Sequence, residues 1–146
     1  MLFRSYDADY LLCCFTRMTD ITPKSRLEGQ RGHVVHTRPW PLIIDHYRER
    51  PGLEPFVRLV EAIASSPVAP QLFGATSMDD LLLSDCQDFL GGDTTLCISY
   101  RPTNHTFTFR HRSFSGRDDE KACAESEVFQ TLRLFLKLKY GILFEA

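Results

Sequence analysis

Two histidines near the start of the chain follow a pair of cysteines, and these four side chains are of the types that bind metal ions. His33 and His36 are separated by two valines, and Cys13 and Cys14 precede them. Imidazole and thiolate groups are the ligands that zinc prefers. A valine pair favours an extended segment, which directs the two rings to opposite faces, and no H-E-x-x-H pattern accompanies them. The sequence therefore predicts neither a metal site nor a cofactor.

A nucleophile or a general base could arise only if folding brought distant residues together. The candidates are Cys86 or Cys123 beside a distant histidine, and the adjacent carboxylates Asp79 and Asp80. The sequence carries no nucleophile elbow, phosphate-binding loop or dinucleotide-binding glycine pattern. We therefore expect a protein without catalytic activity, with a small cysteine- or metal-dependent enzyme as an alternative.

Length and composition predict one ordinary globular domain over residues 1–146. The chain is 43% apolar and 25% charged, with five cysteines and no C-x-x-C pair. An odd number of scattered cysteines indicates reduced structural thiols. The apolar run Leu11–Phe15 is too short for a signal peptide, and no run approaches the roughly 20 residues that cross a bilayer. We expect a cytoplasmic protein that does not associate with membranes.

Acidic residues are concentrated in the middle of the chain. The net charge of −2 argues against a nonspecific nucleic-acid binder. No Lys or Arg lies between Arg58 and Arg101, and six acids give that stretch a local charge of −6. They are Glu61, Asp79, Asp80, Asp85, Asp88 and Asp93. This pattern predicts an acidic surface for a basic protein partner, with Asp79, Asp80, Asp85 and Asp88 as contact residues. Charge pairing with the following arginine-rich segment is the alternative.

Two helices are expected in the region that precedes this acidic stretch. One begins near Leu42 and ends at the break formed by Arg50, Pro51 and Gly52. The next carries an apolar stripe from Phe56 to Ala64 and closes before Pro67. Towards the N-terminus we expect a strand over residues 10–15, a loop over residues 19–32 and a short extended piece over residues 33–36.

Residues 73–86 allow two structures. Ser77 followed by Asp80 could cap a helix, whereas the compact run from Leu81 to Leu83 suits a short buried strand. We prefer the strand. Residues 91–93, which contain two glycines, then predict a turn.

The clearest local pattern is a β-hairpin over residues 95–112. Apolar and polar residues alternate in both arms, and residues 102–105 supply a turn. The alternation places Phe107 and Phe109 on a covered face and Arg110 and Arg112 on a solvated face. A base-stacking nucleic-acid site is therefore not expected, because it needs the aromatic rings and the arginines accessible together.

A long helix is expected after the hairpin. Asp118, Asp119 and Glu120 would suit its N-terminus, the lysines Lys137 and Lys139 its C-terminus, and Gly141 would end it. Packed over the hairpin, it would give an α+β fold in which helices cover one face of an antiparallel sheet.

Trp40 lies between two prolines and is the one large aromatic residue outside a periodic pattern. A rigid exposed tryptophan is typical of interface anchors, so Trp40 is a candidate partner-binding residue. It could equally plug one end of the core. A homo-oligomeric regulatory or ligand-binding domain that assembles through Trp40 or a sheet edge is a further alternative.

The order of elements over roughly residues 76–140 resembles the small α+β immunity proteins that accompany bacterial polymorphic and secreted toxins. The resemblance rests on the segment from Thr76 to Ser84, the hairpin from Leu96 to Arg110 and the helical run from Val128 to Tyr140. It implies a protein without turnover that protects its own cell by covering or inactivating a cognate toxin.

Overall fold

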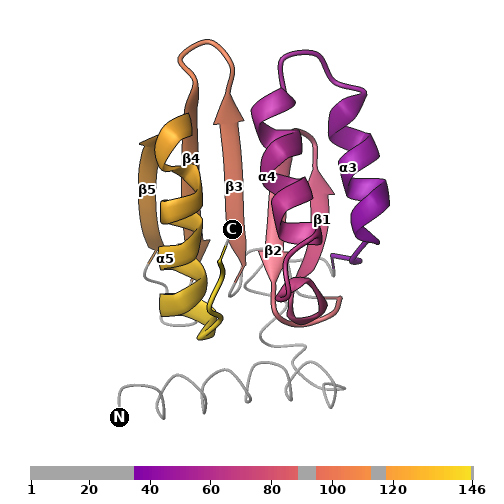
Figure 1. Cartoon of the computed structure of the whole chain (residues 1–146), viewed down its shortest axis with the longest axis vertical. Helices are drawn as coiled ribbons and strands as arrows, with labels where there is room; N and C mark the ends of the chain where they lie inside the picture. Colours follow the sequence, from indigo (N-terminus) through magenta and orange to yellow (C-terminus); the bar gives the residue numbers. More distant parts are fainter. Residues whose placement is uncertain (1–34, 89–94, 113–117, 146) are drawn as a thin grey trace, which may run out of the picture.

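The computed structural model describes residues 35–88, 95–112 and 118–145 (Figure 1). The first elements within these residues are helices α3 (Trp40–Arg48) and α4 (Glu54–Ala64) and the 3-10 turn η1 (Ala69–Gln71). Strands β1 (Phe73–Ser77), β2 (Asp80–Ser84), β3 (Leu96–Arg101), β4 (Thr106–Arg112) and β5 (Asp118–Ala124) follow. The 3-10 turn η2 (Glu125–Glu127) and helix α5 (Val128–Tyr140) complete the order. The strand, loop and turn predicted over residues 10–15, 19–32 and 91–93 lie outside the described residues.

The strands form one antiparallel sheet in the order β1-β2-β3-β4-β5. The described helices α3, α4 and α5 lie on the same face of this sheet, with α3 and α4 over β1 and β2 and α5 over the β4–β5 side (Figure 1). This architecture is α+β, and the predicted arrangement of helices on one face of an antiparallel sheet is confirmed.

The predicted hairpin and the facing of its aromatic residues are confirmed. Tyr100 pairs with Phe107, and Ile98 pairs with Phe109. Phe107 and Phe109 are buried under the helices, and the Phe109 ring stacks on Phe135 of α5 with centroids 5.6 Å apart. Arg110, which points to the other face, is exposed. Strand alternation therefore separates the aromatic rings from the arginine side chain.

The two predicted helices also form, and the apolar stripe of α4 faces the core. Phe56, Leu59, Val60 and Ile63 are fully buried. Tyr47 of α3 stacks on Phe56 with ring centroids 4.6 Å apart, which joins the two helices. Helix α3 begins at Trp40, two residues earlier than expected, because Pro39 and Pro41 occupy positions at a helix start that need no amide donor.

Residues 73–84 form two strands and not the capped helix. Ser77 pairs directly with Asp80, so Met78 and Asp79 make a two-residue turn between β1 and β2. Leu81 and Leu83 point into the core. The preferred strand is correct, but it is only the second arm of a hairpin that the sequence analysis did not recognise.

The long helix predicted from Asp118 is wrong in its first part. Residues 118–124 form strand β5, which pairs along its whole length with β4, and α5 starts only at Val128. The physical reason is tertiary pairing: Glu120 lies opposite Arg110, and the buried Cys123 lies opposite Phe107. These cross-strand pairs override the helical preference of a short acidic segment. The predicted end is correct, because Gly141 adopts a left-handed backbone with φ of +64°.

The prediction that the cysteines are reduced thiols is only partly confirmed. Cys97 and Cys123 are free. Cys86 is disulfide-bonded.

Candidate functional site

The four predicted contact acids lie in two pairs at opposite ends of β2. Asp79 and Asp80 lie at the start of β2, whereas Asp85 and Asp88 follow its end. Strand β2 spans five residues, and a strand rises about 3.3 Å per residue, so the two pairs are more than about 10 Å apart. Each pair has its own environment and has to be considered separately.

At the start of β2, helix α3 fixes the β1–β2 turn, which consists of Met78 and Asp79. His46 Nε2 lies 2.9 Å from the carbonyl oxygen of Met78. A carbonyl oxygen can only accept, so this contact assigns the proton to Nε2. Arg50 forms an ion pair with the Asp79 carboxylate. His46 of α3 and Arg50, which lies two residues after the end of this helix, therefore hold the backbone and the carboxylate of this turn.

Met78 has an unusual backbone for its residue type. Its φ is +56°, and its side chain is 83% exposed, the largest exposed fraction among the exposed large apolar residues described. The other described non-glycine residues with positive φ are Asp88 and His105, and Asp and His are residue types that adopt this conformation more often than most. Methionine is not one of these residue types, and its side chain has only a weak hydrogen-bond acceptor.

Asp80 lies beside a thiol on the face of the sheet that no described helix covers. Cys97 Sγ is 3.8 Å from Asp80 Oδ2. Burial, and then the negative charge of Asp80, raise the pKa of the Cys97 thiol above its usual value. The thiol is therefore protonated near neutral pH, which is the unreactive form.

Asp85 and Asp88 both serve local structure. Asp85 Oδ2 is buried and has no hydrogen-bond partner within the described ranges, and burial raises the pKa of Asp85 to about 8. Asp88 Oδ1 accepts a hydrogen bond of 3.1 Å from the backbone N–H of Thr37 and lies 3.6 Å from His36 Nδ1. Neither carboxylate resembles a free surface charge.

Trp40 packs inward. It contacts the core, and a Cβ placed on Gly74 of β1 would lie 3.1 Å from two atoms of the Trp40 ring. This close packing favours the plug interpretation of Trp40 over the anchor interpretation. The Trp40 ring also explains why position 74 needs a glycine.

A three-residue polar cluster joins the β3–β4 turn to η2. The Tyr100 hydroxyl donates to Glu125 Oε1, and His105 Nδ1 lies 3.1 Å from both oxygen atoms. Burial and the bond to Glu125 raise the pKa of Tyr100 to about 12, and the same bond lowers the pKa of Glu125. The tyrosine stays neutral and the carboxylate charged near neutral pH, so their hydrogen bond ties the end of β3 to η2.

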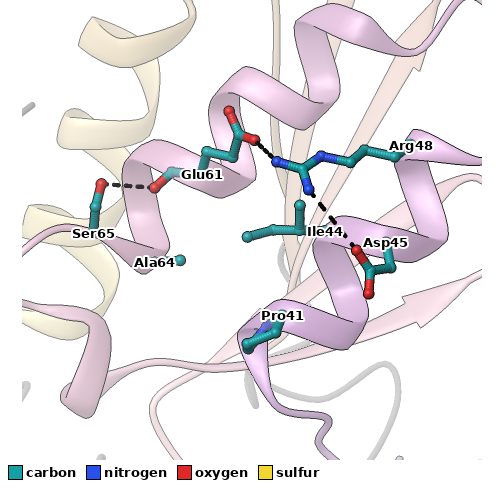
Figure 2. A pocket seen from close by; sticks show the side chains of 7 residues that line it. All are labelled: Pro41, Ile44, Asp45, Arg48, Glu61, Ala64 and Ser65. Atoms are coloured by element: carbon teal, nitrogen blue, oxygen red, sulfur yellow. Dashed lines mark hydrogen bonds and ion pairs between the residues drawn. The ribbon is translucent and has the colours of Figure 1, made fainter.

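A groove of about 430 Å³ separates the outer sides of α3 and α4. Figure 2 shows Arg48 reaching across it to Glu61, with Asp45 on the other side of the guanidinium at 3.9 Å. Ser65 Oγ donates to the Glu61 carbonyl oxygen at 2.7 Å. These polar groups satisfy one another across the groove, so none of them is directed at a ligand.

The described residues contain no arrangement of side chains that would make a metal site from the predicted candidates. Within the ranges that the structure covers, no three His, Cys, Asp or Glu side chains gather as metal ligands, and His33, Cys13 and Cys14 lie outside those ranges. None of the helices in the described part of the chain is long and apolar enough to cross a membrane.

Comparisons with known proteins identify no relative of this chain. No protein-family model, no curated protein and no solved structure matches the chain.

Sequence reasoning missed Met78 and His46. The signal for Met78 was present, because a two-residue gap between Ser77 and Asp80 is the length of a tight hairpin turn. It was obscured because methionine is not a usual turn residue. His46 could not be recognised, because its partner is a backbone atom 32 positions away.

Proposed function

We propose that this chain is a stoichiometric protein-binding domain and that the β1–β2 turn contacts the partner. The observation that carries the proposal is the exposed Met78 side chain on a backbone with φ of +56°. A left-handed backbone costs an L-residue about 1–2 kcal/mol. Glycine, asparagine or aspartate would occupy the position more easily. Local strain that packing does not offset is a reason to infer function.

The chemistry of the turn indicates a protein partner. Methionine is flexible and polarisable, and it is enriched in protein interfaces. Asp79 and Asp80 follow it directly in the chain and add two carboxylates. The complementary surface would be an apolar pocket with basic side chains at its rim, since opposite charges favour the right partner and speed association.

The turn is also preorganised. His46 holds Met78 from helix α3, whose other side is packed in the core, and Arg50, just after the end of this helix, holds Asp79. A fixed turn loses little conformational entropy on binding, which increases the affinity that a small contact area can give.

Among protein-binding domains, we propose an immunity protein that neutralises a cognate bacterial toxin and catalyses no reaction. The resemblance over residues 76–140 supports this class, and the β1–β2 turn falls within it. A cytoplasmic location belongs to the same proposal. The free thiols of Cys97 and Cys123 agree with that location, whereas the disulfide at Cys86 does not.

The test has two steps. Tagged protein would be used to capture partners from the native lysate at low and high salt, in parallel for wild type, Met78→Gly and Asp79→Lys. Each captured protein would then be expressed alone and together with this chain. We expect a partner that is toxic alone, is tolerated when co-expressed with wild type, and is lost from both variants.

Glu145→Lys is the matched control, because it reverses an exposed carboxylate far from the turn along the chain. Thermal unfolding of each variant separates lost binding from lost folding. A captured partner that binds the turn variants as well as wild type would refute the turn as the contact surface. A partner without toxicity would refute the immunity role and leave the binding role standing.

A further inference from the structure

The two edge strands of the sheet, β1 and β5, differ in whether another segment pairs with their outer side. At one edge, β1 is partly covered, since the backbone N–H of Arg38 donates to the Gly74 carbonyl oxygen at 2.9 Å. At the other edge is β5, which pairs with β4 on its inner side and with no described strand on its outer side. An edge strand presents backbone donors and acceptors to a further strand, and residues 120–124 of β5 face no described strand on that side.

Helix α5 adds an apolar flank next to this edge. The buried Thr131 of α5 lies beside the buried Cys123 of β5, which indicates the side of the helix that faces the strand. Leu134 and Leu138 follow Thr131 by three and seven residues and therefore lie on the same side. They are 42% and 52% exposed.

The opposite flank of α5 is occupied. Arg133 Nε donates to the Phe144 carbonyl oxygen at 3.1 Å, so the C-terminal tail lies along that side. Figure 1 shows the tail on the side of α5 that faces away from β5. The two exposed leucines and the edge of β5 thus form one surface.

We infer that this surface binds an extended segment of a partner protein as a sixth strand of the sheet. The backbone of β5 would hydrogen-bond to the added strand, and Leu134 and Leu138 would pack on its apolar side chains. This mode of recognition combines backbone affinity with side-chain specificity. The inference does not depend on which protein contacts the β1–β2 turn.

The charges of β5 select the partner and disfavour a second copy of this chain. Lys121 is exposed at the centre of the strand. A symmetric antiparallel pair of β5 strands would place this lysine against its equivalent, and like charges directly opposite are destabilising. On the other face, Glu120 lies in register with Arg110 of β4. A lysine or arginine on the added strand would continue this alternation of charges.

The test uses a short synthetic peptide in which valine and lysine alternate. Binding would be followed by NMR of the labelled chain and by titration calorimetry. We expect slowed amide exchange confined to β5 and the adjoining part of α5. The double variant Leu134→Ser/Leu138→Ser should weaken binding by about tenfold. These leucines are exposed, so the variant should fold, and its thermal unfolding would verify this.

Three controls separate strand addition from other binding. The same peptide with alternate backbone amides N-methylated keeps every side chain but loses half of its donors, and it should not bind. A peptide with glutamate in place of lysine should bind more weakly. Equal binding of the methylated peptide would show side-chain docking on α5 and overturn the inference. A stable homodimer in sedimentation equilibrium that the double variant abolishes would overturn it as well.

Discussion

His46 Nε2 lies 2.9 Å from the carbonyl oxygen of Met78, so helix α3 fixes the turn from which the Met78 side chain projects. The contact links residues 32 positions apart. It gives the β1–β2 turn a defined orientation relative to the core, and the following predictions test this arrangement and its surroundings.

Replacing Met78 with glycine should not destabilise the fold. Glycine adopts a φ of +56° without steric cost, so the free energy of unfolding should stay unchanged or rise by as much as about 1 kcal/mol. Urea denaturation measures this. Gly141→Ala is the opposite case, because φ there is +64° and nothing lies within 4 Å of the added Cβ. It should destabilise by about 1 kcal/mol through backbone strain alone. A large loss of stability in Met78→Gly would show that the methionine is structural.

Removing the His46 or Arg50 side chain should loosen the turn without unfolding the protein. Both side chains of the Arg50–Asp79 pair are partly exposed, so a double-mutant cycle should give a coupling of about 0.2–1 kcal/mol. His46→Ala should accelerate hydrogen exchange of the turn amides and leave the exchange of β3 and β4 unchanged. Unchanged exchange at the turn would contradict the anchoring role of His46.

The sequence allowed the hairpin of β3 and β4 to be predicted because its signal is local. Alternation over two adjacent arms fixes both register and facing, and the burial of Phe107 and Phe109 follows from it. Strand β5 could not be predicted in the same way. Asp118, Asp119 and Glu120 suit a helix start by themselves, and only the pairing with β4 makes them a strand.

The site was predictable only in part, for a related reason. The acids were correctly identified as a charged stretch, but sequence proximity did not show that β2 separates them into two environments. Nor could it show that Asp85 is partly buried or that Arg50 and Thr37 bind Asp79 and Asp88. These contacts depend on the packing of α3 against β1 and on where the chain leaves β2.

Gly74→Ala should destabilise the fold because the space for a side chain is filled. An added Cβ would lie 2.9 Å from Ile43 Cδ1 and 3.1 Å from the Trp40 ring. Overpacking of this kind costs about 1–3 kcal/mol. Ile43→Val removes the nearest atom, so the double variant should be less destabilised than the sum of the two single changes. Strict additivity in chemical denaturation would show that the close contact is not the cause.

Asp85 should make stability fall as the pH rises. Its pKa in the folded protein is about 8, above the ordinary value of 3.8, so the folded state binds the proton more tightly than the unfolded state. The free energy of unfolding should therefore decrease between about pH 4 and pH 8 through this group.

Asp85→Asn removes that dependence and should stabilise the protein at pH 8 by about 1–3 kcal/mol, since it replaces a charge that has a buried, unpaired oxygen. At pH 4 the two proteins should be nearly equal. Parallel stability curves for wild type and Asp85→Asn over this range would contradict the buried environment of the carboxyl group.

The central claim is that the exposed Met78 side chain contacts a protein partner, and a side-by-side titration of the captured partner tests it most directly. Wild type, Met78→Gly and Leu42→Ala would be compared, because Leu42 is another large exposed apolar residue on the described surface. We predict that Met78→Gly is as stable as wild type and binds at least about tenfold more weakly, a loss of about 1.4 kcal/mol, while Leu42→Ala binds like wild type. Wild-type affinity in Met78→Gly would contradict the claim.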